Sequence, residues 1–286
     1  MAITIHETDE LYEDLLRLPV EARSAFFSQR LIQPFQKALE RVGMPATPES
    51  LACFPLTGRD AELARMLTML KQSDAWAGAR ETVQRASERF RRAGVPVPEN
   101  VILGIFLGDP KMLAHSEGYT GFGSIPGYIQ VVIAPNDSNL RKLNACIAHE
   151  FHHNVLFHNA RWNFMDVSLP QYLAVEGLAE SFATSMFGAE ALGPWVTGVT
   201  GNDLETARRI IADALDVKGF MEVRKYVFGD HPMLPASESV GVPYCGGYAV
   251  GYWAVQSFLR KTGMSVEEAT LIDGERIIRE SGYFDT

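Results

Sequence analysis

Cysteine is scarce in this chain, which has Cys53, Cys146 and Cys245 among its 286 residues. The odd number and the wide spacing exclude a disulfide framework, and the lack of a Cys-x-x-Cys pair excludes a cysteine-based zinc knuckle. Cys146 lies in an apolar stretch with helical spacing, so we expect it to be a small buried hydrophobic residue.

Long hydrophobic runs and excess positive charge are missing as well. The apolar run Val101–Leu107 is far shorter than the roughly 20 residues that cross a bilayer. The N-terminus has no basic segment followed by an apolar one, so no secretory signal is expected. The net charge of −9 disfavours nucleic acid and anionic membrane surfaces as partners. We therefore expect a cytoplasmic protein.

The first 98 residues are predicted to form a helical N-terminal region. Apolar residues recur there at helical spacing, with Pro34 dividing the second stretch and a break near Ser73 in the third. The predicted stretches are Glu7–Arg17, Glu21–Arg41 and Asp60–Arg92. His6 is expected to lie in a mobile or surface segment before them.

The character changes over residues 99–286, which we predict to be a second domain. Val101–Leu107 and Tyr128–Ala134 have the length and the β-branched composition of strands, and a glycine-rich loop joins them between Gly118 and Gly127. Helices are predicted at residues 139–158, 169–187, 203–215, 220–228 and 248–260. Strands are few, so the fold class is α+β and mainly helical. Phe106, Phe122, Trp162 and Phe164 are expected in the core rather than in a specificity pocket.

The segment His149-Glu150-Phe151-His152-His153 contains the pattern His-Glu-x-x-His. Residues four apart share one face of a helix, so the imidazoles of His149 and His153 can reach one cation. Glu150 projects beside that cation without binding it, where it can take a proton from a zinc-bound water. The pattern therefore predicts a zinc ion with Glu150 as general base.

A catalytic zinc normally has three protein ligands and an open position for water, so a third ligand is required. The next predicted helix supplies Glu176-Gly177-Leu178-Ala179-Glu180, beginning 23 residues after His153. Glu176 and Glu180 lie four apart on one face. One can bind the metal while the other accepts a hydrogen bond from a ligating histidine. Gly177 permits the close helix–helix approach that lets a glutamate reach the ion.

These two motifs together resemble the gluzincin metallopeptidases and, more narrowly, the predicted zinc-dependent proteases of the family DUF2268. The resemblance implies a zincin-like catalytic domain with a small β-sheet and an active-site helix. It implies Glu176 as third zinc ligand, Glu150 as general base and Glu180 as an outer carboxylate. The sequence departs from the thermolysin pattern in having glutamate instead of aspartate at position 180.

The resemblance extends to two other features of gluzincins. The strand before the active-site helix lines the cleft and pairs with an extended peptide, and Tyr128–Ala134 stands in that place. A tyrosine of a later helix stabilises the oxyanion, and the glycine-rich segment Tyr244–Tyr252 offers Tyr248 and Tyr252, of which Tyr248 is preferred. Ordinary packing against the core is an equally good interpretation of both tyrosines.

The other histidines are not expected to bind the metal. His152 falls off the ligand face of the helix and is expected at the surface or in the outer surroundings of the metal. His115 and His231 lie in predicted loops. The glycine-rich loop before the second strand is interpreted as a flap or as the edge of a cleft.

The sequence thus predicts a zinc-dependent metallopeptidase that acts on peptide or protein substrates. One alternative keeps the metal and makes the protein an amidase or deacylase for small molecules. Another is a non-catalytic protein with a degenerate metallopeptidase fold, against which the intact ligands and the intact Glu150 argue. Substrate preference and oligomeric state stay open.

Overall fold

The computed structural model describes residues 1–163, 165–232 and 235–285, so the prediction for Phe164 lies outside the described residues. The chain divides into two compact units. Residues 1–88 and 97–154 form the first, and residues 89–96 and 155–286 form the second. This division does not test whether residues 1–98 and 99–286 are separate domains, which stays a prediction.

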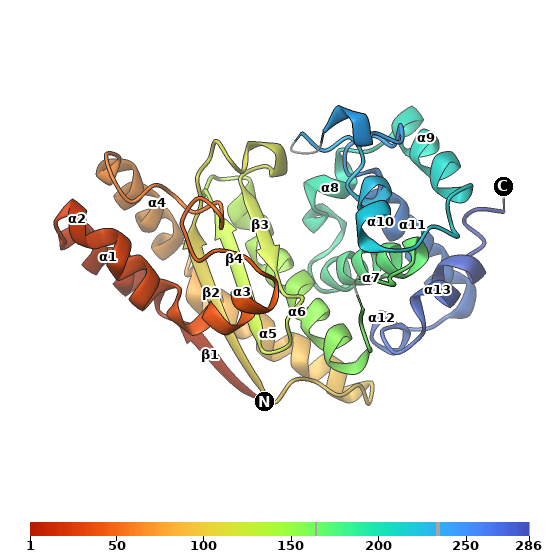
Figure 1. Ribbon diagram of the computed structural model, residues 1–286. Coiled ribbons are helices and arrows are strands. Elements are labelled where there is room, and N and C mark those ends of the chain that lie inside the picture. Colours follow the sequence, from red (N-terminus) through yellow and green to blue (C-terminus); the bar gives the residue numbers. More distant parts are fainter. Residues whose placement is uncertain (164, 233–234, 286) are drawn as a thin grey trace. The chain divides into compact units, whose positions relative to one another are not determined.

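The first unit contains one four-stranded sheet and several helices (Figure 1). The strands are β1 (Ala2–His6), β2 (Asn100–Leu107), β3 (Tyr119–Phe122) and β4 (Tyr128–Ile133). The helices are α1 (Thr8–Arg17), α2 (Val20–Phe26), α3 (Gln36–Arg41), α4 (Asp60–Gln72), α5 (Ala75–Arg92) and α6 (Leu143–Asn159), the last two continuing into the second unit. The predicted breaks near Pro34 and Ser73 are confirmed.

The order of the sheet is β1-β2-β4-β3, with β1, β2 and β4 parallel and β3 antiparallel to β4. Two predictions need correction. The segment Gly118–Gly127 is not only a loop, because it contains β3. The strand predicted at Tyr128–Ala134 has β2 on one side and β3 on the other, so it cannot offer an edge to a peptide. The edge strand next to β4 is β3, and β1 forms the other edge of the sheet.

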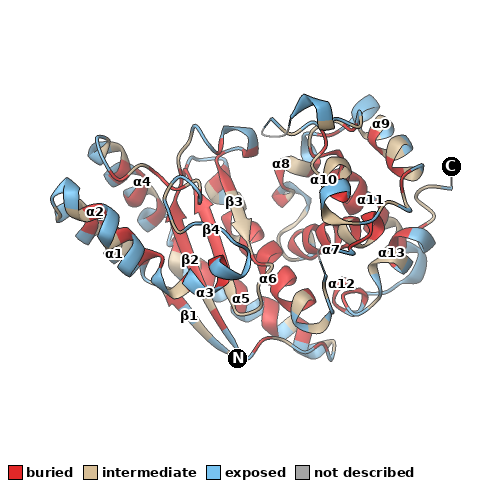
Figure 2. Ribbon diagram, viewed as in Figure 1, coloured by how far each residue is buried: buried red, intermediate tan, exposed pale blue. Residues whose placement is uncertain are grey.

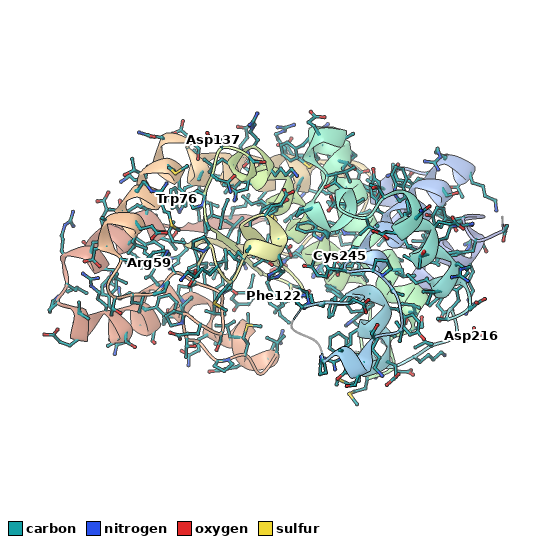
Figure 3. The ribbon with its side chains drawn as sticks, turned by 90° about the horizontal axis from the view of Figure 1, so that it is seen from above. Arg59, Trp76, Phe122, Asp137, Asp216 and Cys245 are labelled. Carbon is teal, nitrogen blue, oxygen red and sulfur yellow. The ribbon has the colours of Figure 1, made fainter. Side chains whose placement is uncertain are left out.

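The N-terminal segment is likewise not a mobile tail. β1 pairs in parallel with β2, and Nε2 of the half-buried His6 lies 2.9 Å from the carbonyl oxygen of Leu31. Trp76 of α5, labelled in Figure 3, donates to the hydroxyl of Thr8, which donates to the carbonyl of Ile105 in β2. The start of the chain is therefore part of the core of the first unit.

The two faces of the sheet carry different neighbours. Gly121 of β3 pairs with Val131 of β4, and since paired residues point to the same side, they share a face. Helix α6 lies against this face, because its Glu150 contacts Gly121. The ring of Phe35 packs on the opposite face, 5.5 Å from that of Phe106. Figure 2 shows β2 and β4 buried over most of their length, as expected for strands covered on both faces.

The second unit is helical in the residues that the structure describes. Its helices are α7 (Leu169–Phe187), α8 (Pro194–Thr197), α9 (Gly201–Ala212), α10 (Phe220–Val227), α11 (Gly246–Thr262), α12 (Val266–Ala269) and α13 (Gly274–Glu280). The predictions for α7, α9, α10 and α11 are confirmed, whereas the short α8, α12 and α13 were not predicted. Ser168 begins α7 with a capping box that it forms with Gln171.

Glycines bring α7 and α11 into close contact. A Cβ atom on Gly177 would lie 2.2 Å from the carbonyl oxygen of Gly251, and one on Gly251 would lie 2.5 Å from that of Leu173. Gly247 in turn faces the backbone of α10, where its Cβ would lie 2.4 Å from Cα of Val227. The glycines around the predicted tyrosine cluster are thus explained by helix packing.

Taken together, the described residues form a mainly helical α+β protein with a single small mixed sheet, which confirms the predicted fold class. None of the helices in this part of the chain is long and apolar enough to span a membrane.

Candidate metal centre

Helix α6 carries the His-Glu-x-x-His motif, and a hydrogen-bonded turn precedes it. The side chain of Asn136 accepts hydrogen bonds from the backbone N–H groups of Ser138 and Asn139, and a short 3-10 turn at Asn139–Lys142 leads into the helix. Asn136 therefore forms a side-chain-bonded turn just before the helix. From Leu143 the helix is rich in apolar residues, as a helix of the interior must be.

His149 and His153 lie one turn apart on α6 and face one another. Their ring centroids are 4.7 Å apart with the ring planes at 85°, and each residue is only 4% exposed. Two imidazoles this close can direct nitrogens toward one cation, as the spacing predicted. Burial removes competing water, so a cation would replace the hydrogen bonds that imidazoles otherwise make with solvent.

Glu150 lies between the two histidines in sequence and turns toward the edge strand. Cβ atoms added to Gly121 and Gly123 would lie 2.3 Å from Oε1 and 2.1 Å from the backbone oxygen of Glu150, respectively. Only glycine leaves room for this contact between α6 and the end of β3. The glycines of the segment therefore serve to bring the edge strand against Glu150, a relationship that sequence reasoning missed.

Glu176 lies in the second unit on α7 and is 8% exposed. Its charge raises the pKa of two neighbours, both already raised mainly by burial: the Tyr172 hydroxyl and the Cys245 thiol, the latter to about 11. Cys245, labelled in Figure 3, is the residue before α11 and has a left-handed backbone conformation with φ of 60°. Tyr172 and Cys245 are therefore neighbours of the Glu176 carboxylate in the second unit.

The donor set fits a zinc ion. Among the described residues, His149 and His153 of the first unit and Glu176 of the second are candidates to hold a metal, since each is buried and offers an imidazole nitrogen or a carboxylate oxygen. Two neutral nitrogens and one carboxylate match the composition of catalytic zinc sites and leave a position for water. His115 and His231 do not belong to this group.

Glu180 has partners of its own in the second unit. Its carboxylate accepts a hydrogen bond from the backbone N–H of Gly193 at 2.6 Å and another from Nε1 of Trp195 at 2.9 Å. These bonds fix the carboxylate one turn after Glu176, between α7 and the start of α8. Its predicted place as an outer carboxylate of the metal stays a prediction.

The two candidate tyrosines differ in their surroundings. Tyr252 is buried in an apolar cluster with Val196, Val199 and Ala249, and its hydroxyl is hydrogen-bonded to Thr184. Burial and the charge of Glu180 raise its pKa, which that bond opposes. Tyr248 is half-buried, with its ring stacked on that of Phe228 at 6.1 Å.

The remaining histidines are placed as follows. His152 is fully buried, so a surface position is wrong. His115 is exposed in a short 3-10 turn. His231 is half-buried in a loop, with its ring 5.3 Å from that of Tyr244.

Aromatic rings surround the start of α7, which sequence reasoning did not predict. Tyr172 lies within 6.3 Å of the rings of Trp162, Phe220 and Phe228. All four side chains are half-buried. The expectation that Trp162 is a fully buried core residue is therefore only partly met, as it is for Phe122, whereas Phe106 is buried.

Comparison with known proteins identifies the family of the chain. The model of the family described as "Predicted Zn-dependent protease (DUF2268)" matches residues 75–279. The chain belongs to this family. It is also 37% identical over 303 residues to the uncharacterized protein YjfC of Bacillus subtilis strain 168, and the match covers the whole of both chains. No solved structure matches. The resemblance to DUF2268 is confirmed, whereas membership of the wider gluzincin group stays a prediction.

Proposed function

We propose that this member of DUF2268 is a zinc-dependent metallopeptidase with His149, His153 and Glu176 as metal ligands. The observation that carries the proposal is the buried pair of imidazoles on α6 with the Glu150 carboxylate beside them, set against the edge strand of the sheet. The family description, which names a predicted zinc-dependent protease, supports the same function.

A zinc ion held by these ligands would polarise the scissile carbonyl and lower the pKa of an attacking water. Glu150 would act as general base, because it follows the proposed ligand His149 directly in sequence and its carboxylate lies against Gly121. It accepts a proton from the attacking water and returns it to the leaving amine. Gly121 and Gly123 keep this carboxylate in place without covering it with a side chain.

The edge strand favours a peptide over a small molecule as substrate. Ala134 donates from its backbone N–H to the carbonyl of Gly118, and by the alternation of antiparallel pairs Thr120 also bonds to β4. The backbone groups of Gly121 therefore point to the outer edge of the sheet, while its missing side chain makes room for Glu150. An extended peptide paired with Gly121 would run beside the proposed base.

Tyr248 is the better candidate for stabilising the oxyanion. The hydroxyl of Tyr252 is already bonded to Thr184 inside an apolar cluster, whereas Tyr248 keeps part of its surface exposed. A donor to the oxyanion must be able to face the substrate, so exposure favours Tyr248.

The three cysteines are buried and unpaired by disulfides, which fits a reducing compartment such as the cytoplasm. In such a compartment thiols stay reduced and do not form disulfides. Cytoplasmic location is therefore part of the proposal.

The test is hydrolysis of a peptide library by the zinc-loaded protein and by Glu150→Gln, with an amide and acyl-ester panel beside it. We expect the wild type to cleave peptides and the variant to lose roughly 10²- to 10⁴-fold in rate with zinc retained. Cleavage of the small-molecule panel alone would favour an amidase or deacylase. Zinc-loaded protein inactive on both, or an active Glu150→Gln, would contradict the proposal.

A further inference from the structure

Asn154 follows His153, the second histidine of the motif, and its side-chain amide forms hydrogen bonds through both its oxygen and its nitrogen. It is 0% exposed. Its Oδ1 accepts a hydrogen bond from the backbone N–H of Gly127 at 2.7 Å, and its Nδ2 donates to the carbonyls of Gly123 at 2.6 Å and Tyr128 at 2.9 Å. Gly123 and Gly127 belong to the connection between β3 and β4, and Tyr128 is the first residue of β4.

The chemistry of these partners requires an amide. Two of them are carbonyl oxygens and need N–H donors, and the third is an N–H group and needs an acceptor. A carboxylate of the same shape would place an oxygen against two carbonyls, and a hydrophobic side chain would leave three buried backbone groups without their bonds. Asparagine alone satisfies this arrangement among side chains of this size.

Asn154 holds the connection between β3 and β4. This connection fixes the position of β3 relative to the His-Glu-x-x-His motif. Gly123 lies against the backbone of Glu150, and Gly121 lies against its carboxylate. The bond to the Gly123 carbonyl is therefore one turn of α6 away from the contact between Gly123 and Glu150. Displacing the β3–β4 connection would shift the edge strand relative to the carboxylate.

We infer that Asn154 is a positioning residue, which holds the edge strand β3 at a fixed place over Glu150 so that a peptide paired with the strand presents its scissile bond to the base. This inference rests on the proposed function. Neither the proposed metal ligands nor the proposed base has this role, because none of them fixes β3, the strand with which a peptide would pair.

The test compares Asn154→Asp with Asn159→Ala in a series of peptides of increasing length that share one scissile bond. Asn159 is a matched control on the same helix, since its amide also donates to two carbonyls, those of Pro96 and Val155, outside the β3–β4 connection. Gly123→Ala is a second variant, because its Cβ would push the same connection off α6 without altering Asn154.

In the wild type and in Asn159→Ala, kcat/KM should rise with peptide length as more residues pair with β3. In Asn154→Asp and Gly123→Ala this gain should be lost, leaving kcat/KM for the longest peptides reduced roughly 100-fold, with zinc content unchanged. A merely structural role would lower activity equally at every length, in step with the folded fraction. That result, or a full gain with length in Asn154→Asp, would overturn the inference.

Amide hydrogen exchange separates this inference from the proposed function. The Gly127 amide, which donates to Asn154, loses its acceptor in Asn154→Leu and should exchange faster there than in Asn159→Ala, whereas the carboxylate of Asn154→Asp keeps an oxygen that can accept this bond. Unchanged exchange would overturn the assignment of Asn154 even if peptides are cleaved. A zinc-loaded wild type that cleaves no peptide would instead overturn the proposed function, whatever the exchange shows.

Discussion

Gly121 of the edge strand and Glu150 of helix α6 are in such close contact that a Cβ atom on the glycine would lie 2.3 Å from Oε1, 2.5 Å from Cγ and 2.6 Å from Cδ of the glutamate. Because glycine has no side chain, Gly121 leaves the space that the carboxylate of Glu150 occupies. Its backbone also forms part of the edge at which a peptide substrate would pair. One residue therefore links the proposed base with the proposed substrate strand.

Replacing Gly121 with alanine should displace the carboxylate more than it harms the fold. The atoms that clash are the far end of a flexible side chain, so Glu150 can turn away, and we expect a stability loss of only about 1 kcal/mol. Peptidase activity should fall roughly 10²-fold because the base leaves its place. Steady-state kinetics and urea unfolding measure the two effects.

Gly78→Ala is the matched control for this variant. Gly78 lies on α5, and its Cβ would also meet a flexible side-chain end, that of Asn144, at 3.1 Å. Activity of this control should stay near that of the wild type. Equal activity of Gly121→Ala and Gly78→Ala would contradict the proposed contact between β3 and the base.

The crossing of α7 and α11 should be sensitive to a single methyl group. A Cβ atom on Gly177 would meet the backbone oxygen of Gly251 at 2.2 Å, and a backbone cannot turn away as a side chain can. Gly177→Ala should therefore lower the free energy of unfolding by about 1–3 kcal/mol, as overpacking does. Urea denaturation beside Gly78→Ala measures this, and equal stability of the two variants would refute the close crossing.

Phenylalanine substitutions should distinguish the roles of the two tyrosines of α11, Tyr248 and Tyr252. Tyr252→Phe loses the bond to Thr184 and should cost about 0.5–1.5 kcal/mol of stability while leaving kcat nearly unchanged. Tyr248→Phe should lower kcat roughly 10²-fold, because an oxyanion donor acts in the transition state. Kinetics and thermal unfolding of both variants decide, and the reverse pattern would assign the oxyanion role to Tyr252.

Local patterns in the sequence were sufficient to predict the elements that carry the proposed metal ligands. The helical spacing of apolar residues predicts α6 and α7, because periodicity depends on neighbouring residues. The capping box of Ser168 with Gln171 was not predicted and is seen in the structure. The two histidines are also a local pattern, four apart on one helix, whereas Glu176 comes from the next long helix, 23 residues after His153. These residues stay proposals until a metal is measured.

The strands β1 and β3 could not be predicted in the same way. β3 contains Gly121, against which Glu150 lies, and it exists as a strand because β4 pairs with it. β1 is short and is stabilised by pairing with β2, almost 100 residues later. β1 depends on a strand distant in sequence, and Gly121 of β3 depends on Glu150 in a later helix, so a window of local periodicity has no means to detect them. The role of Asn154 likewise depends on backbone groups of an earlier segment.

The most direct test of the central claim is the zinc content of the purified protein. Mass spectrometry of wild type, His149→Ala, Glu176→Ala and His158→Ala should be compared, all prepared without chelators or an affinity tag. His158 lies at the exposed end of the same helix and controls for the loss of an imidazole. The account predicts about one zinc per chain in wild type and His158→Ala, and loss of most of it in the other two. Folded wild-type protein that contains no zinc and takes up none when it is added would contradict the account.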